Sequence, residues 1–276
     1  MTGTRALARI RQNPVHPEME KVMMIVERLI SVRTIQKHRV NKIGDGEMIE
    51  VIVQNREEAI EAEDFGAGRV ELVTGIEAGG LTPSCGTIKS VLNSVTIPVQ
   101  VMIRPNGYSH CYSEEEKEVI LEDIRILSEL GGNRIVIGGI TKDHTIDEEL
   151  LETIIQQQPD IDITFHRAFE ELSSQKEGYK TLAQYPNVKR ILTSGANQEG
   201  QERISQLQEL VRYSEESGPT IMPGSGLSLA TIESIHQVVQ AEEYHFGKGV
   251  RVGEDFSNHF SEKSIKSIEQ VLNKRK

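Results

Sequence analysis

The chain has 276 residues, a formal net charge of −11, no Trp and only 4 % aromatic residues. This acidic balance and the scarcity of stacking side chains give no support for binding to nucleic acid or to an anionic membrane surface. No apolar run approaches the roughly 18 residues of a transmembrane helix, and two cysteines make no disulfide framework, so a cytoplasmic protein is expected.

Residues 1–47 differ in charge from the rest of the chain. They hold nine Lys or Arg and five Asp or Glu, a balance of +4, which leaves −15 for the remainder. The apolar spacing of residues 19–35 predicts an amphipathic helix, so this segment is expected to be a partly helical N-terminal extension. An organelle-targeting peptide is the alternative, although Glu18, Glu20 and Glu27 depart from its acid-poor composition.

A regular alternation of strands and helices begins at Met48 and continues through residue 276. In the first unit, Asn55 is placed to cap a helix and Gly66 to end it. Pro83 is expected at the first position of the next helix, and Ser113 with Glu116 forms the pattern of a capping box. The predicted strands are 48–53, 69–73, 98–103, 134–138, 161–165, 188–192, 219–222 and 243–246. The predicted helices span approximately 55–66, 83–94, 113–131, 147–157, 174–184, 199–217, 228–240 and 261–273.

Eight strand–helix units without a linker predict one domain over residues 48–276. Helical crossovers between successive strands imply a parallel sheet, and eight units of this size favour a closed (β/α)8 TIM barrel in the α/β class. A doubly wound open sheet is the alternative. It would usually carry G-x-G-x-x-G after the first strand, and residues 53–56 do not match that pattern.

Several polar side chains follow the predicted strands and would converge at the barrel's carboxyl-terminal mouth. Arg104 and Arg167 are predicted to bind an anion, because a planar guanidinium suits a carboxylate or a phosphate. Glu71 and His166 are the acid/base candidates, since a partly buried site tunes either group toward neutral pH. With His245, these residues predict a small-molecule site, although each alone is more often part of a local ion pair.

Two glycine-containing loops after the sixth and seventh strands are candidate anion cradles, because their backbone N–H groups are free to face a ligand. Their members are Ser194, Gly195, Gly224, Ser225 and Gly226. The loop after the eighth strand adds Lys248 and Arg251. Simple turns are the alternative interpretation of these loops.

The two cysteines suggest a different ligand. Cys85 is placed in the first turn of a helix, where the helix dipole lowers a thiol pKa, and Cys111 follows His110. Cu(I) prefers thiolate and imidazole ligands, so Cys85, His110 and Cys111 form a metal-site hypothesis, with His166 as a further ligand. Two ordinary cysteines are the alternative. The chain has no C-x-x-C zinc pattern and no G-x-S-x-G nucleophile elbow.

Six separated motifs in this order resemble the copper homeostasis protein CutC family. They are Glu71–Leu72, Gly79–Ser84, Met102–Pro105, Thr164–Phe169, Ile191–Gly195 and Ile221–Gly226. The resemblance covers Met48 to about Phe246. It implies a (β/α)8 barrel, a cytoplasmic location and a role in copper handling, with Cu(I) bound through cysteines in some members.

The chain departs from that family pattern at three places. Val73 stands where the family usually has a cysteine. Residues 106–111 stand where the family usually has a glycine-rich segment that contains an acidic residue. Residues 246–249 alter the segment after the eighth strand.

Two hypotheses follow from the sequence. By resemblance, the chain is a cytoplasmic copper homeostasis protein that binds Cu(I). From its matching polar residues, it is instead a TIM-barrel enzyme acting on a small phosphorylated or carboxylated metabolite. Whether it is an enzyme, and whether it forms a homo-oligomer, is left open by the sequence.

Overall fold

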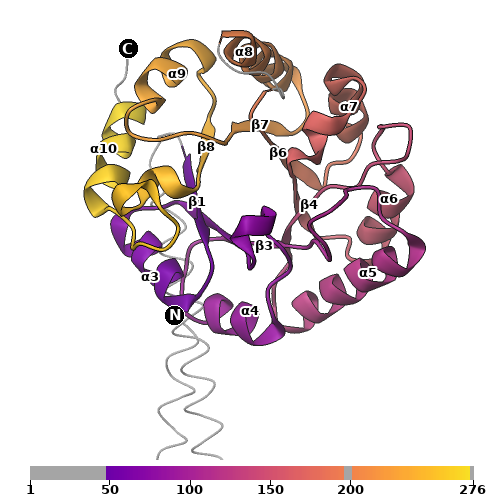
Figure 1. Ribbon diagram of the computed structural model, residues 1–276. Coiled ribbons are helices and arrows are strands. Elements are labelled where there is room, and N and C mark those ends of the chain that lie inside the picture. Colours follow the sequence, from indigo (N-terminus) through magenta and orange to yellow (C-terminus); the bar gives the residue numbers. More distant parts are fainter. Residues whose placement is uncertain (1–47, 196–200, 274–276) are drawn as a thin grey trace, which may run out of the picture. The chain divides into compact units, whose positions relative to one another are not determined.

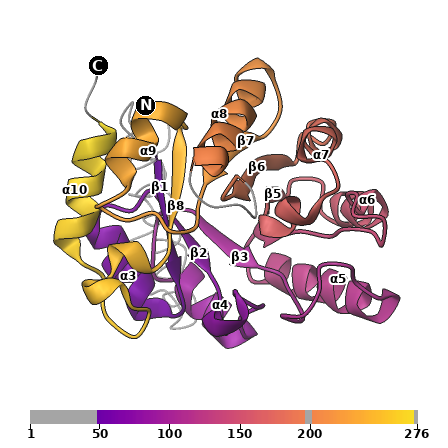
Figure 2. The ribbon, with the colours of Figure 1, turned by 45° about the horizontal axis from the view of Figure 1, so that its top comes forward.

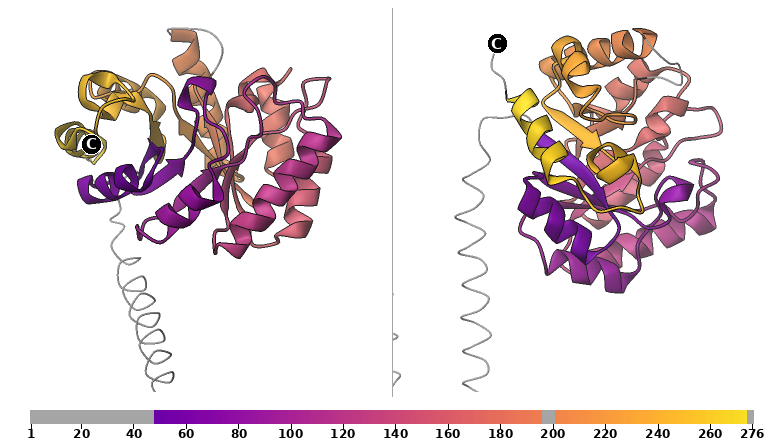
Figure 3. Two further views of the ribbon diagram at one scale, coloured as in Figure 1. Left: turned by 60° about the horizontal axis from the view of Figure 1, so that its bottom comes forward. Right: turned by 60° about the vertical axis from the view of Figure 1, so that its left-hand side comes forward.

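Eight parallel strands form the wall of a barrel, and helices surround it, as Figure 1 shows along the barrel and Figures 2 and 3 show from other directions. The computed structural model describes residues 48–195 and 201–273. The strands are β1 (Met48–Val53), β2 (Arg69–Leu72), β3 (Val99–Met102), β4 (Arg134–Ile137), β5 (Asp162–Phe165), β6 (Val188–Thr193), β7 (Thr220–Pro223) and β8 (Glu243–Phe246). The TIM-barrel prediction is confirmed, while the predicted N-terminal extension lies outside the described residues.

The α-helices follow the strands in turn and cover the outside of the barrel (Figure 1). They are α3 (Arg56–Phe65), α4 (Cys85–Leu92), α5 (Glu114–Glu129), α6 (Glu148–Gln157), α7 (Gln175–Leu182), α8 (Gln201–Glu216), α9 (Ile232–Val239) and α10 (Glu262–Leu272). None of the helices in the described ranges is both long and apolar enough to cross a bilayer.

The helix ends follow the capping chemistry that the sequence predicts. The Asn55 side chain accepts a hydrogen bond from the backbone of Glu58, and Gly66 ends α3 with a φ of 105°. The Ser113–Glu116 capping box opens α5 with both of its hydrogen bonds present. These contacts satisfy backbone groups that a helix end leaves unpaired.

Two predicted helix starts are wrong. Helix α4 begins at Cys85 rather than Pro83, because the Ser84 side chain is the N-cap and accepts from the Thr87 backbone. Helix α9 begins at Ile232 rather than Ser228, since the Thr231 hydroxyl and Ser228 form a turn before it. A short 3-10 helix, η4 (Arg167–Glu171), also follows β5 and was not predicted.

The alternation of side chains along each strand separates an outer apolar layer from a mixed barrel interior. In β1, Val51 and Val53 face the helices, whereas Glu50 faces inward and is fully buried. Val73, Met102 and Val136 form a small apolar cluster of their own. Charged side chains occupy the amino-terminal side of the interior, and their pairing there compensates the cost of removing charge from water.

Arg69 is central to the charged part of the interior. Its guanidinium forms ion pairs with Glu50 and with Glu243, the latter at 2.5 Å. Farther round the barrel, Asp162 accepts from Arg134 and Arg190. Each of these buried or half-buried charges therefore has an opposite charge beside it.

The barrel seam lies between β7 and β8, where the described strands have no ladder of backbone hydrogen bonds. Tight packing after the two strands holds this seam. A Cβ atom at Gly249 would lie 2.0 Å from the Leu227 backbone oxygen and 2.9 Å from the Ser228 Cα atom. Only glycine permits this close approach of two backbones.

Replacing Gly249 with alanine is therefore expected to destabilise the protein by about 1–3 kcal/mol, because backbone atoms must move to admit the methyl group. Urea denaturation measures this change. The control is Gly86→Ala on α4, where the added methyl group meets only the Ser84 hydroxyl at 3.8 Å. The control should be neutral or stabilising by about 0.5–1 kcal/mol, and equal destabilisation of both variants would contradict the packing argument.

Candidate functional site

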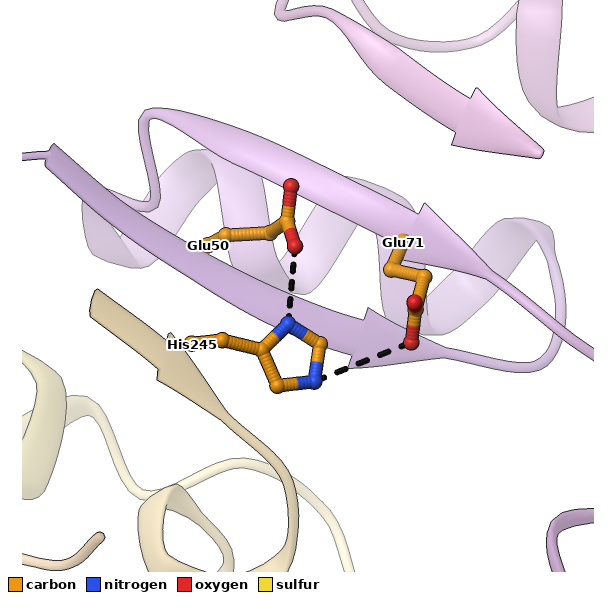
Figure 4. Close-up of side chains that lie close together, drawn as sticks. All are labelled: Glu50, Glu71 and His245. Carbon is orange, nitrogen blue, oxygen red and sulfur yellow. Dashed lines mark hydrogen bonds and ion pairs between the residues drawn. The ribbon is translucent and has the colours of Figure 1, made fainter. Parts of the chain in front are cut away.

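Two groups of polar side chains lie in the barrel interior and at its carboxyl-terminal mouth. The first consists of Glu50, Glu71 and His245, which come from the adjacent strands β1, β2 and β8 (Figure 4). The Nδ1 atom of His245 lies 2.7 Å from Glu50 Oε1, and its Nε2 atom lies 3.7 Å from Glu71 Oε2. The imidazole thus bridges two buried carboxyl groups.

The two carboxyl groups of this cluster have different acidities. Burial opposes ionisation of Glu50, but the Arg69 charge and the His245 hydrogen bond hold the pKa of Glu50 well below its ordinary value. Burial raises the pKa of Glu71 to about 7, because Arg69 lies nearer to Glu50 and His245 compensates it only in part. Burial lowers the pKa of His245, but Glu71 and Glu50 outweigh it and raise that pKa overall. Such a separation of two carboxyl pKa values is typical of acid/base sites.

This cluster is also the one group of three potential metal ligands found within residues 48–195 and 201–273. Its donors are two carboxylates and one imidazole, without sulfur. The predicted copper ligands do not form such a group: Cys85 is exposed on α4, and Cys111 is half-buried in the loop before α5. The described residues therefore present no preassembled thiolate site of the kind that Cu(I) prefers.

The second group lies at the ends of β3 and β5 and contains Arg104, His110 and His166. His166 caps η4, and its Nδ1 atom accepts a hydrogen bond of 3.1 Å from the Ala168 backbone. Its ring lies over Gly138 in β4's following loop, where an added Cβ would come within 2.4 Å of it. The His166 Nε2 atom is buried and has no hydrogen-bond partner among the described residues.

Arg104 is held by the loop that follows β2. Its Nη1 atom donates to the carbonyl oxygens of Ala78 and Gly80, at 2.9 and 3.3 Å. Its Nε atom is buried and finds no partner in the described part of the chain. Burial holds the pKa of His166 well below its ordinary value, and repulsion from His110, when that ring is charged, and from the Arg104 guanidinium adds to the effect. His166 is consequently a neutral imidazole at physiological pH.

His110 lies beside His166, with ring centroids 4.7 Å apart. Its Nδ1 atom lies 2.7 Å from Glu171 Oε1, a contact between residues 61 positions apart. Burial lowers the pKa of His110 more than the Glu171 carboxylate raises it. The loop with His110 and Cys111, which was interpreted as a source of metal ligands, thus brings the His110 imidazole next to the predicted anion site.

Arg167 is placed differently from the other predicted anion ligand. Its guanidinium makes two hydrogen bonds to Glu170, at 3.0 and 2.8 Å, and its side chain is half exposed. Glu170 also accepts from the Ser194 backbone at 2.5 Å. The positive charge of Arg167 is thereby offset by a neighbouring carboxylate, so Arg104 is the less neutralised of the two guanidinium groups.

The glycine-containing loops are joined by Arg203, a residue that sequence reasoning missed. Arg203 donates to the carbonyl oxygens of Ser194, Gly224 and Ser225. Gly195 and Gly226 have φ values of 100° and 69°, as tight turns require. These contacts give the loops a place in the fold, and their role in anion binding stays a prediction.

Arg251, in the loop after β8, was expected to contribute to anion binding, but the structure gives it other partners. Its guanidinium is buried, donates to Ile52 and Asn258 carbonyl oxygens, and pairs with Glu58 at 2.6 Å. It therefore fastens the loop to β1 and α3. Lys248 is exposed.

A cavity of ≈ 610 Å³ lies at the opposite, amino-terminal end of β6 and β7. Its carboxylates are paired, Asp162 with Arg134 and Arg190, and Glu243 with Arg69, while Lys189 in its lining is exposed. The mouth, by contrast, contains buried polar atoms without partners. The mouth is also the end of the barrel where catalytic groups of this fold gather.

Sequence reasoning also missed Glu50 and Glu171. A signal for Glu50 exists, because it is the one acid within an otherwise apolar strand and its alternation places it inside the barrel. No local signal marks Glu171, since its contact with His110 depends on how the loops after β3 and β5 meet.

Comparison with known proteins relates the chain to the CutC family, both through the family model and through individual relatives. Residues 47–250 match the model of the CutC family. The chain is 37 % identical over 202 residues to a mouse protein named copper homeostasis protein cutC homolog, covering 73 % of this chain and 74 % of that one. A human protein with the same name is 36 % identical over 202 residues, covering 73 % of each chain.

Solved structures support the same fold. The crystal structure of a CutC protein from Streptococcus agalactiae matches with a TM-score of 0.67 and 30 % identity, covering 73 % of this chain and 98 % of that one. Phosphoribosyl anthranilate isomerase from Thermotoga maritima matches with a TM-score of 0.56 and 16 % identity, covering 82 % and 98 % of the two chains. The second likeness concerns the fold alone.

The raised pKa of Glu71 makes stability depend on pH. Because its folded pKa of about 7 exceeds the ordinary value of 4.5, the folded state binds the proton more tightly, and stability falls as pH rises between these values. Glu71→Gln should flatten this fall, as measured by urea denaturation between about pH 4.5 and pH 8. The control Glu77→Gln changes an exposed carboxylate, and a Glu71→Gln curve that is as steep as the control's would refute the assignment.

Proposed function

The chain belongs to the CutC family, and we propose that its barrel mouth binds a small anionic metabolite and performs acid/base chemistry on it. The supporting observation is a set of buried polar atoms that have no partner among the described residues. Besides single atoms of Gln100, Tyr112 and Arg251, they are Glu71 Oε1, Arg104 Nε and His166 Nε2, and these last three carry the proposal. They come from or directly follow three different strands, β2, β3 and β5.

Unpartnered buried polar atoms are costly. Each costs on the order of 1–3 kcal/mol, so most proteins pair them unless a ligand does so. Two of the three atoms are donors, since Arg104 Nε carries a hydrogen and neutral His166 carries its proton on Nε2. A carboxylate or phosphate oxygen would satisfy these donors. The anionic group is therefore assigned to the side of the mouth formed by β3 and β5.

Glu71 supplies the acid/base function on the other side of the mouth. With a pKa of about 7, it is present in both protonation states at neutral pH. His245 and Glu50 extend it into a buried chain of titratable groups. Because burial disfavours the charged carboxylate, Glu71 can hold a proton up to near-neutral pH and then release it.

Copper binding is the second candidate, because the curated relatives carry copper homeostasis in their names. Its ligands would be Cys85, His110 and Cys111, with His166 beside His110 as a further ligand. The fit to Cu(I) is poor, since Cys85 and these groups form no cluster of ligand atoms. Either function suits the cytoplasm, where Cys85 and Cys111 would remain reduced, and neither requires a homo-oligomer.

Phosphate- and carboxylate-bearing metabolites are expected to raise the melting temperature of the full chain, because a ligand that binds only the folded state stabilises it. Arg104→Ala and His166→Gln should each remove this shift in a thermal denaturation screen. The control Arg125→Ala removes an exposed guanidinium that pairs with Glu122 on α5. The proposal fails if Arg125→Ala and Arg104→Ala lose the shift equally, or if a broad library gives no shift.

The copper candidate predicts stoichiometric Cu(I) uptake in a competition titration with a chromogenic chelator. The double variant Cys85→Ser/Cys111→Ser should lose this uptake, because it removes both thiolates that Cu(I) prefers. The control His259→Gln removes an imidazole that is 89 % exposed and should bind as the unchanged chain does. Undiminished affinity in the double variant would exclude the cysteines as ligands.

A further inference from the structure

The two histidines of the mouth, His110 and His166, have complementary and fixed proton positions. Their rings lie 4.7 Å apart at 60° to each other, and they come from different elements. His110 belongs to the loop between β3 and α5, and His166 directly follows β5. Each ring has one nitrogen whose role is set by a neighbouring group, so the role of its other nitrogen follows.

In His166 the backbone N–H of Ala168 donates to Nδ1. A nitrogen that accepts a hydrogen bond carries no proton, so the neutral ring bears its hydrogen on Nε2. That Nε2–H group is buried and unpartnered among residues 48–195 and 201–273. It is a donor held ready for an oxygen acceptor. The same hydrogen bond occupies the only lone pair of the neutral ring, so His166 ligates a metal only if it gives up its contact with Ala168.

In His110 the arrangement is reversed. The Glu171 carboxylate lies 2.7 Å from Nδ1 and only accepts, so Nδ1 carries the hydrogen and Nε2 has a free lone pair. The carboxylate would also stabilise the imidazolium that forms when Nε2 takes up a proton, as in other histidine–carboxylate pairs. The backbone of Glu171 is held in turn by His144, whose Nδ1 lies 2.9 Å from the Glu171 carbonyl oxygen.

We propose, building on the proposed anion-binding function, that His110 and His166 form a proton-transfer pair for a small anionic carbonyl compound. His110 Nε2 removes a proton from the carbon next to the carbonyl group. His166 Nε2–H donates a hydrogen bond to the carbonyl oxygen. Arg104 lies near both rings and contributes a positive charge.

The step balances without an added reactant. The C–H bond breaks as an N–H bond forms on His110, and the electron pair of the C–H bond becomes part of a new C=C bond. The carbonyl π electrons move to oxygen, which becomes an enolate oxygen bonded by His166. Return of the proton to the same carbon restores the substrate. No group is oxidised or reduced, so the class of reaction is enolisation, and its product is the same carbonyl compound with its carbon-bound hydrogen exchanged once the proton on His110 has exchanged with solvent.

A neutral donor suits this chemistry. Because neutral His166 stays uncharged, it polarises a carbonyl oxygen without giving up its proton to the bulk solvent. The charged and titratable groups that act on His110 are Glu171, Arg104 and Arg167, with His166 next to it. Among these, only Glu171 favours the protonated form of His110.

The proton positions are tested directly by long-range ¹H–¹⁵N spectra of the full chain labelled in histidine, with peaks assigned through His110→Gln and His166→Gln. We expect the Nδ1–H form for His110 and the Nε2–H form for His166, with no titration of His166 between about pH 6 and pH 8. An Nδ1–H form of His166, or a charged His166 at neutral pH, would overturn the proposal.

The chemistry is tested by the exchange of carbon-bound hydrogen in D₂O, using pyruvate and dihydroxyacetone phosphate as probes and ¹H NMR as the readout. His110→Gln should slow exchange by about 100-fold or more, the usual contribution of a general base. Glu171→Gln retains an acceptor for Nδ1 but loses the charge, so it should move the pH profile of exchange to lower pH. The control is Glu118→Gln, an exposed carboxylate of α5.

The outcomes separate this inference from the proposed function. Thermal stabilisation by the probes without exchange would overturn the proton-transfer pair and leave the anion site standing. Absence of both stabilisation and exchange would remove the proposed function and the pair together. Exchange that His110→Gln leaves unchanged would show that another base acts, and would overturn the role of His110.

Discussion

The ion pair between Arg69 and Glu50 inside the barrel is the interaction on which the mouth depends. Glu50 is fully buried, so an isolated carboxylate at this place would be strongly disfavoured. Arg69 keeps it ionised, and Glu50 in turn orients His245 through Nδ1. The other imidazole nitrogen then lies 3.7 Å from Glu71, and among the described residues no guanidinium forms an ion pair with that carboxyl group. The buried Arg69–Glu50 ion pair therefore keeps Glu50 charged, while Glu71 takes up and releases a proton near neutral pH.

The same constraint explains why the interior of this barrel is polar on its amino-terminal side. Buried ions are tolerated when each has a partner and the remaining hydrogen-bonding groups are satisfied. Arg69 meets this condition with two carboxylates, and Asp162 meets it with two guanidinium groups and the Gln100 amide. At the mouth the condition is not met, since Glu71, Arg104 and His166 each retain an unpaired buried atom. On the amino-terminal side Gln100 Oε1 is also unpaired, but Arg69 and Asp162 keep their counter-ions there, whereas Arg104 at the mouth has no carboxylate paired with it among the described residues.

The fold was largely predictable from the sequence, because caps and strand patterns are local. Asn55, Gly66 and the Ser113–Glu116 box marked their helix ends by short-range chemistry that the structure reproduces. The composition of the mouth was less predictable. The sequence expected Glu71, Arg104, His166 and His245 in one group, whereas the structure gives two groups, one on β8, β1 and β2 and one after β3 and β5. This partition follows from the circular order of the strands.

The pairing of His110 with Glu171 shows why the contacts between loops at the mouth escaped prediction. It joins two loops 61 residues apart, and its consequence, a free Nε2 lone pair, depends on which ring nitrogen the carboxylate reaches. His110 also lies in the segment where this chain departs from the CutC pattern, so the family resemblance assigned it no partner. A thiol beside an imidazole suggested a soft metal. The carboxylate leaves Nε2 of that imidazole as its acceptor atom, while the neighbouring imidazole has its own acceptor nitrogen occupied and can only donate.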